Sequence, residues 1–159
     1  MLDPLFDAAL RSLYATLAPS EVLWVVTGSL SFALRGLPFT PHDIDIQTNE
    51  AGAYAIARLF GEQVTRPVTC SSTTTIRSHF GALSLHGLTI ELMGDIQKRL
   101  PDYSWEPPVD LLHWRRYVEY KELRVPVLAL AYEAEAYRLM GRLEKAALLA
   151  EAACEEPDA

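Results

Sequence analysis

Residues Val22–Thr48 read VLWVVTGSLSFALRGLPFTPHDIDIQT, and the rest of the chain is interpreted outward from this segment. Its first part, Val22–Val26, is an apolar run with the composition of a buried strand. The run ends at Gly28-Ser29, where the glycine permits a tight backbone turn and the serine can open a helix. Leu30–Arg35 then has the pattern of a short helix closed by a glycine. The segment predicts a strand, a sharp turn and a helix in succession.

The segment ends in a second strand, in which Asp43 and Asp45 alternate with Ile44 and Ile46. Because strand side chains alternate between faces, we expect both carboxylates on one face and both isoleucines in the core. Two carboxylates at this spacing repel each other unless a cation lies between them. Their hard oxygen atoms suit Mg²⁺, which binds one or two carboxylates and completes its shell with water and phosphate oxygens.

The combination of turn and acids is more informative than either part. A Gly-Ser pair alone usually marks only a turn, and an Asp-x-Asp pair alone is usually a solvated strand edge. In this chain they follow each other at strand ends, with a spacer of thirteen residues, Leu30 to His42. The start of a helix favours phosphate, and the acids favour a divalent cation. The spacing therefore predicts a site for a nucleoside triphosphate.

At these residues the chain resembles the DNA polymerase β-like nucleotidyltransferase superfamily, over Val22 to about Met93. Two later stretches, VPVLAL from Val125 and AYRLMGRLEK from Ala136, are similar to the C-terminal portion of its small bacterial branch. That branch includes lincosamide and aminoglycoside adenylyltransferases and toxin-type nucleotidyltransferases. The resemblance implies an α/β (α+β) fold, in which helices back a mixed sheet and a C-terminal helix follows.

The resemblance also implies the chemistry. A nucleoside monophosphate would pass from an NTP, with ATP the expected donor, to a hydroxyl acceptor, and pyrophosphate would leave. Two Mg²⁺ ions would be held by Asp43, Asp45 and a third acid on a neighbouring strand. Glu91, flanked by apolar residues in the expected strand Leu88–Met93, is that acid and a candidate general base. The family more often has Asp there, and Asp95 in the following loop is the alternative.

Three further residues are assigned to the nucleotide. Gly28 and Ser29 are expected to bind the triphosphate through backbone N–H and hydroxyl donors. The resemblance places a basic residue of the last helix, expected over Ala129–Ala153 with a break at Gly141, near the triphosphate or the acceptor. We assign Arg138 to this role in preference to Lys145. The alternative is that these bases only form solubilising (i, i+4) pairs.

Caps, periodicity and prolines predict the remaining elements. Helices are expected from Asp3-Pro4 to Pro19 and over Ala51–Phe60. A loop is expected over Asp95–Asp110. Cys70–Ile76 is either a strand or a polar loop, and we favour a loop that runs into a strand. Strands are expected over Val64–Val68 and Leu123–Leu128, both at sheet edges because of Pro67 and Pro126, and over Ser78–Leu85 and Leu111–Tyr120.

Composition limits the class of protein. The chain has 159 residues, half of them apolar, and a net charge of −7, so bulk binding to duplex DNA is not expected. Two distant cysteines make neither a metal motif nor a disulfide framework, which favours a cytoplasmic protein, and no apolar run reaches membrane-spanning length. We expect a single domain over residues 1–150, helical from about residue 129, and an acidic flexible tail over residues 151–159.

The sequence leaves the acceptor open. The chain would adenylylate a small hydroxylated molecule, or act as a toxin-type enzyme on tRNA or a partner protein, or bind nucleotide without turnover. The base preference is equally open. Because the chain is short, a homodimer or a partner protein is a candidate to complete the acceptor side of the cleft.

Overall fold

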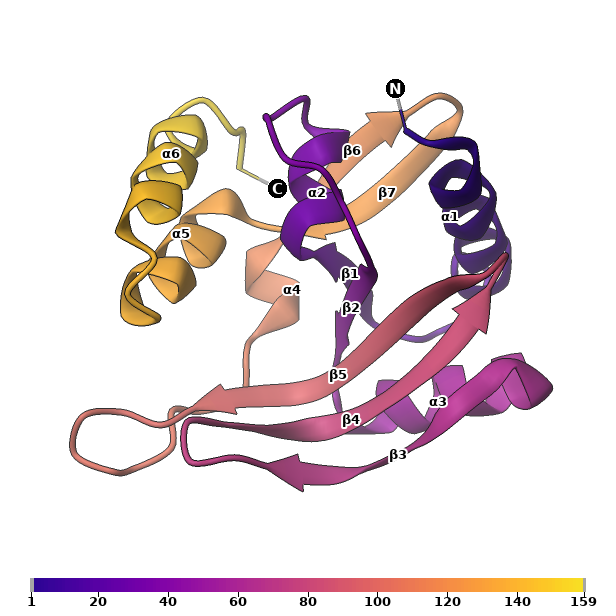
Figure 1. Ribbon diagram of the computed structural model, residues 1–159, viewed down its shortest axis with the longest axis horizontal. Coiled ribbons are helices and arrows are strands. Elements are labelled where there is room, and N and C mark those ends of the chain that lie inside the picture. The colour runs from indigo at the N-terminus through magenta and orange to yellow at the C-terminus, as the bar shows by residue number, and fades with distance from the viewer. Residues whose placement is uncertain (1, 159) are drawn as a thin grey trace.

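The computed structural model describes Leu2–Asp158, and within them the chain forms one seven-stranded mixed sheet flanked by helices (Figure 1). The strands are β1 (Trp24–Thr27), β2 (Ile44–Thr48), β3 (Val64–Ser72), β4 (Ile76–Leu85), β5 (Leu88–Lys98), β6 (Arg115–Tyr120) and β7 (Leu123–Leu128). The helices are α1 (Pro4–Leu17), α2 (Gly28–Leu34), α3 (Glu50–Phe60), α4 (Leu111–Trp114), α5 (Leu130–Leu139) and α6 (Leu143–Ala153), with a 3₁₀ turn over Gly61–Gln63. These elements confirm the predicted α/β class.

The strand order β3-β4-β5-β2-β1-β7-β6 differs from the order in the chain. β2 lies between β1, to which it is antiparallel, and β5, to which it is parallel. In this register Thr27 lies opposite Asp45, and Asp45 lies opposite Glu91. The sheet thus brings the end of β1 and the beginnings of β2 and β5 together.

One face of the sheet packs against α1 and α3 (Figure 1). Ile44 and Ile46 are 0 % exposed and lie in this core with Leu10 of α1 and Ile56 of α3. Each fully buried aliphatic side chain contributes about 1.5–3 kcal/mol, so this alternation fixes which face of β2 points inward. The expectation that both isoleucines lie in the core is confirmed.

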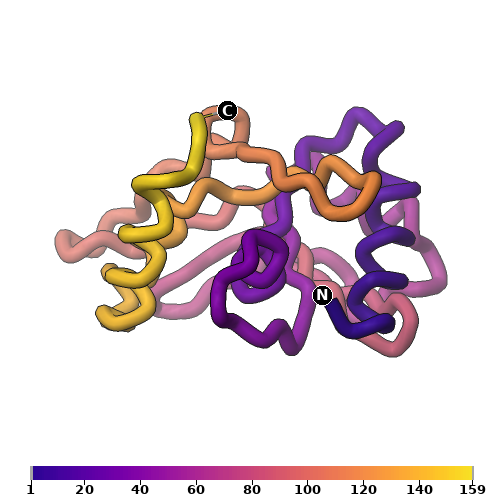
Figure 2. The backbone as a smooth tube through the Cα atoms, turned by 90° about the horizontal axis from the view of Figure 1, so that it is seen from above, coloured from indigo at the N-terminus to yellow at the C-terminus, as the bar shows by residue number. Residues whose placement is uncertain are grey.

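The opposite face carries two smaller cores. Phe32 of α2 packs with Leu130 of α5 and Leu149 of α6, and α4 packs through Leu111 against Val25. Figure 2 shows α6 and α1 on opposite sides of the molecule. This opposite face, against which α2, α4 and the C-terminal helices pack, is called the site face below.

Local capping explains where the longer helices begin. Asp3 Oδ1 accepts a hydrogen bond from Leu5 N, and Pro4 occupies the first position of α1. Asn49 Oδ1 likewise accepts from Gly52 N at the start of α3. Both helices confirm the prediction. Among the helices of Leu2–Asp158, none combines the length and the apolar composition that crossing a bilayer requires.

Both predicted loops beside β4 and β5 are partly wrong. β3 continues to Ser72, so the loop expected over Cys70–Ile76 is shorter. β5 continues to Lys98, which pairs with Ile76 of β4, so Asp95–Lys98 are strand residues. Pairing with β4 satisfies the backbone groups of a polar stretch that the local pattern assigns to a loop.

Two predictions near the last strands are also wrong. Residues Leu111–Trp114 form α4 instead of a strand, because Asp110 caps them by accepting from His113 N. Pro126 is not at a sheet edge, since β7 lies between β1 and β6. The pairing of β7 with β1 is centred on Val26 and Val127, so it needs no N–H from Pro126.

The C-terminal portion is a helical hairpin. Gly141 separates α5 from α6, as predicted. The acidic segment 151–158, whose composition suggests a flexible tail, begins as the last turn of α6. Glu156 then accepts hydrogen bonds from Arg35 Nε at 2.6 Å and from Leu130 N at 2.8 Å. In the Arg35–Glu156 ion pair the side chains are only 8 % and 13 % exposed, so this pair anchors the segment to α2 and α5.

Candidate functional site

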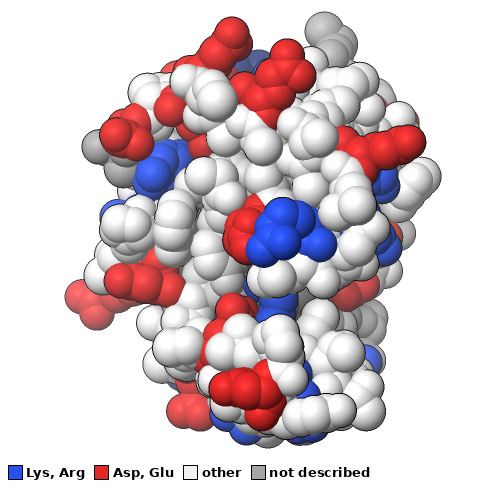
Figure 3. All heavy atoms as spheres, turned by 90° about the vertical axis from the view of Figure 1, so that its left-hand side faces the viewer, with Lys and Arg blue, Asp and Glu red and all other residues white. Residues whose placement is uncertain are grey.

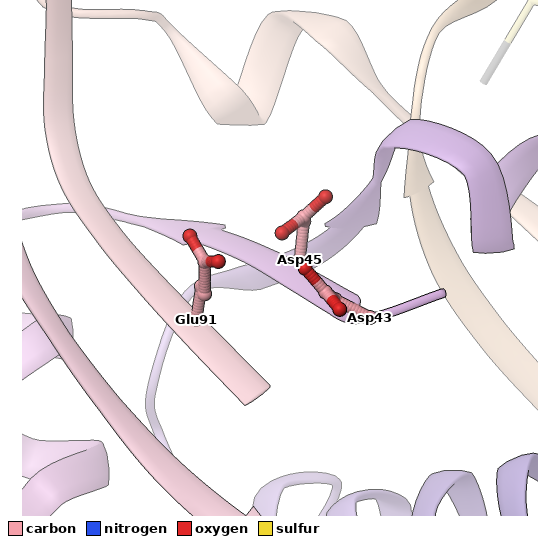
Figure 4. A group of neighbouring side chains, drawn as sticks. All are labelled: Asp43, Asp45 and Glu91. Atoms are coloured by element: carbon pink, nitrogen blue, oxygen red, sulfur yellow. The ribbon is translucent and has the colours of Figure 1, made fainter. Parts of the chain in front are cut away.

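Three carboxylates converge on the site face of the sheet (Figure 4). Asp43 precedes β2, Asp45 lies in β2 and Glu91 lies in β5, and one oxygen from each lies within 4.8 Å of the others. Asp43 is exposed, whereas Asp45 and Glu91 are half-buried. The structure therefore brings together the three acids that the sequence singles out, and the alternative third acid, Asp95, lies outside this cluster.

Electrostatics mark this cluster as a place for a cation. Burial first, and then the charges of Glu91, Asp43 and Glu133, raise the pKa of Asp45 to about 7. Burial and the charge of Asp43 also raise the pKa of Glu91, whereas Arg66 lowers it. Three hard oxygen donors that repel one another fit a divalent cation such as Mg²⁺. The donor set therefore suits the metal that the resemblance implies.

Gly28 approaches the acids more closely than another residue could. Its φ is +73°, and a Cβ placed on it would lie 2.9 Å from Asp45 Oδ2. A side chain at this position would therefore meet both a strained backbone and the carboxylate. The Gly28-Ser29 turn therefore lies directly beside Asp45.

The carboxylate of Glu133, in α5, is hydrogen-bonded to Thr27 and Gly28 at the start of the Gly28-Ser29 turn. This residue was not identified from the sequence. Its side chain is 4 % exposed, accepts from Thr27 Oγ1 at 2.5 Å, and accepts from Gly28 N at 2.9 Å. Burial raises the pKa of Glu133, and these hydrogen bonds act in the opposite direction. A signal was present, because Leu130, Glu133 and Ala134 follow the (i, i+3, i+4) spacing of a buried helix face, where a lone acid is unusual.

This hydrogen bond changes the role expected for Gly28. Its N–H is donated to Glu133, so it is already engaged and does not face an incoming phosphate. The close approach of Gly28 to Asp45 remains its structural contribution. Of the two turn residues, Ser29 is therefore the candidate to donate hydrogen bonds to an anion.

A hollow of about 580 Å³ adjoins the turn and the acids. Gly28, Ser29 and Asp45 line it from the turn and β2, and Tyr137, Arg142 and Lys145 line it from the C-terminal hairpin. The remaining lining residues are Pro38, Phe39, Thr40 and His42 of the loop before β2, and Glu144 and Leu148 of α6. The hollow therefore combines hydroxyl, basic and aromatic groups next to a carboxylate cluster.

The basic residues of this hollow are Arg142 and Lys145, and the structure does not bring Arg138 to it. The guanidinium of Arg142 lies 5.7 Å from the Tyr137 ring centroid, and Lys145 Nζ lies 5.9 Å from that of Phe39. Arg138 instead pairs with Glu135 and lines a separate alanine-rich groove between α5 and α6. Arg138 and Arg142 are four residues apart and would share a face of one continuous helix. The break at Gly141 separates α5 from α6, so the two arginines point in different directions.

Charge on this side of the molecule is dispersed. Figure 3 looks onto the side that carries α5 and α6, and Lys and Arg form no continuous surface there among the described residues. The net charge of −7 agrees with this view. Positive charge near the site is therefore local, as at Arg142 and Lys145.

Comparison with known proteins gives one family match and two similar solved structures. Residues 9–152 match the profile of a family described as aminoglycoside-2''-adenylyltransferase. A solved structure of TM1012 from Thermotoga maritima, a candidate nucleotidyltransferase, shares 51 % identity over 98 % of this chain and 97 % of that chain, with a TM-score of 0.86. Lincomycin-bound LnuA, a lincosamide antibiotic adenylyltransferase, shares the fold at 13 % identity and a TM-score of 0.50, over 83 % of this chain and 84 % of that chain. No curated protein sequence matches.

Proposed function

Because the chain belongs to the aminoglycoside-2''-adenylyltransferase family of nucleotidyltransferases, we propose that it transfers AMP from ATP to a hydroxyl acceptor and releases pyrophosphate. One observation carries the proposal: three carboxylates lie within 4.8 Å of one another beside the Gly28-Ser29 turn. The family and the fold support nucleotidyl transfer in general. The donor, the metal and the acceptor are the parts that the proposal adds.

Asp43, Asp45 and Glu91 are the residues that would hold Mg²⁺. Bound there, divalent cations would supply charge neutralisation at the reacting phosphates and would make an acceptor hydroxyl more acidic. Because Gly28 has no side chain, the Asp45 carboxylate can keep its place in the cluster. A group already in place favours catalysis, because it needs no reorganisation during the reaction.

The triphosphate would lie in the hollow lined by Ser29, Arg142 and Lys145. The hydroxyl of Ser29 would donate to a phosphate oxygen, and the two basic side chains would balance its negative charge. Tyr137 and Phe39 line the same hollow and offer aromatic faces to the nucleobase. The hollow lies on the α2 side of Asp45, and Glu91 lies on the other side, so donor and acceptor would approach from opposite directions.

Glu91 would act as the general base. Its half-buried carboxylate lies on the side of Asp45 away from the hollow, where the acceptor hydroxyl would approach and give up its proton. In the transfer, the acceptor oxygen forms a bond to the α-phosphorus, the bond to the β-phosphate bridge breaks, and pyrophosphate leaves. The proton of the hydroxyl passes to Glu91, so charge and atoms balance.

The test uses ATP labelled at the α-phosphate. Asp45→Asn should abolish Mg²⁺-dependent release of pyrophosphate and transfer of label. Asp95→Asn is the matched control, since it makes the same change on β5 outside the acid cluster, and it should retain activity. Circular dichroism and thermal unfolding would establish that both variants fold. Label transfer by a folded Asp45→Asn variant at the normal rate would refute the proposal.

A further inference from the structure

The site face of the sheet continues beyond Glu91 onto β4 and β3. The register sets Asp45 opposite Glu91, Glu91 opposite Ala82, and Ala82 opposite Arg66. The helices that pack most extensively on these strands, α3 and α1, belong to the core on the other face (Figure 1). A single row of side chains therefore runs from the acid cluster to the sheet edge, and it ends in an arginine.

This row has a defined chemistry and length. Ala82, which lies between Glu91 and Arg66 in this row, has a small side chain and is 8 % exposed. The adjacent row of the same face contains Met93 and Phe80, which are both half-buried. Two strand spacings separate Glu91 from Arg66, about 10 Å between Cα atoms. A small molecule with a hydroxyl at one end spans this distance when the arginine side chain reaches inward.

Arg66 is exposed, stacks on the ring of Phe80 and forms no ion pair within the described residues. Its guanidinium carbon lies 4.7 Å from the centroid of the Phe80 ring. Register shifts in the β3–β4 pairing lie on both sides of Arg66, and such bulges re-aim individual side chains. Between Leu2 and Asp158, no carboxylate oxygen lies within 4 Å of Arg66. A stacked, unpaired guanidinium is ready to bind an anion.

We propose that the acceptor carries an anionic group, a phosphate or a carboxylate, which Arg66 binds while the acceptor hydroxyl lies at Glu91. This inference rests on the proposed function, because it assigns the acceptor side of the same site. The donor triphosphate does not account for Arg66, since the hollow with Arg142 and Lys145 lies on the other side of Asp45. At the Arg66 end of the row, an anionic group of the acceptor would be attracted and a cationic group repelled.

Binding of small probes tests the inference directly. The probes are glycerol 3-phosphate, glycerate, glycerol and the polycation kanamycin, each titrated into protein saturated with Mg²⁺ and α,β-methylene-ATP and followed by ligand-observed NMR. The nucleotide analogue occupies the hollow, so anions cannot use Arg142 and Lys145. We expect glycerol 3-phosphate or glycerate to bind at least about tenfold more tightly than glycerol, because charge-assisted hydrogen bonds are the stronger ones. Comparing the affinities of glycerol 3-phosphate and glycerate shows whether the site prefers phosphate or carboxylate.

Arg66→Gln should remove the preference for the anionic probes over glycerol. Arg58→Gln makes the same change at an exposed position of α3, on the other face of the sheet, and should keep this preference. Equal binding of glycerol and both anions, no binding of either anion, tighter binding of kanamycin, or an unchanged preference in Arg66→Gln would each overturn the inference. Mg²⁺-dependent binding of the analogue, and its loss in Asp45→Asn, is measured in the same samples. That measurement tests the proposed function separately, so failure of one does not imply failure of the other.

Discussion

Glu133 Oε2 accepts a hydrogen bond of 2.9 Å from the backbone N–H of Gly28, although the two residues lie 105 positions apart in the chain. The same carboxylate accepts from Thr27 Oγ1, so it is bonded to the last residue of β1 and to the first residue of α2. Gly28 in turn abuts Asp45 Oδ2. A buried side chain of the C-terminal hairpin therefore sets the position of the turn beside the acid cluster.

Glu133→Gln should weaken catalysis without removing any group that would touch substrate. The amide retains one acceptor oxygen but cannot accept from both Thr27 and Gly28, so one buried donor is left unsatisfied at a cost of about 1–3 kcal/mol. We expect a lower melting temperature and a lower kcat. Glu135→Gln is the control, because Glu135 lies on the exposed side of α5 and contacts Arg138. Equal stability and kcat in the two variants would contradict the positioning role of Glu133.

Gly28→Ala should lower the rate of transfer roughly 100-fold, whereas Gly36→Ala should leave it nearly unchanged. Both glycines have a positive φ, +73° and +78°, so both alanine variants carry similar backbone strain of about 1–2 kcal/mol. Only at Gly28 would the new Cβ meet Asp45 Oδ2, since nothing lies within 4 Å of a Cβ at Gly36. Displacing a catalytic group by about 1 Å costs roughly 100-fold in rate. Comparable kcat/KM values for the two variants would show that the contact with Asp45 is unimportant.

Metal-free protein should lose stability as the pH rises between about 4 and 7. Asp45 has a raised pKa of about 7 against a usual 3.8, so folding takes up a proton in this interval and stability falls towards the upper end. Mg²⁺ should restore stability near neutral pH, because it compensates the charge that deprotonation creates. Melting temperatures with EDTA and with Mg²⁺ measure both effects. Asp45→Asn should flatten the pH dependence relative to Asp95→Asn, and equal slopes would rule out Asp45 as its source.

Arg142→Gln and Lys145→Gln should raise KM for the nucleotide, whereas Arg138→Gln should leave it unchanged. Only the first two side chains line the hollow beside Ser29 and Asp45. Loss of one charged hydrogen bond to a phosphate costs about 1.5–3 kcal/mol, which corresponds to roughly tenfold to a hundredfold in affinity. Initial rates of pyrophosphate release at varied ATP concentration give the KM values. An increase for Arg138→Gln alone would restore the assignment made from the sequence.

The sequence by itself determined the local parts of the site. Alternation of acids and isoleucines places Asp43 and Asp45 on one face of β2, and the glycine–serine turn at the end of β1 follows from composition. These patterns depend on neighbours within a few residues, and backbone geometry then dictates where the side chains point. The α/β class and the break at Gly141 follow from the same kind of local signal.

Only the tertiary structure decided which distant residues meet. The parallel register of β2 and β5 sets Glu91, and not Asp95, beside Asp45. The docking of the C-terminal hairpin buries Glu133 behind Gly28 and turns Arg142 and Lys145, instead of Arg138, towards the hollow. Strand pairing and helix docking are set by burial summed over the whole core, so no single segment of the sequence encodes them.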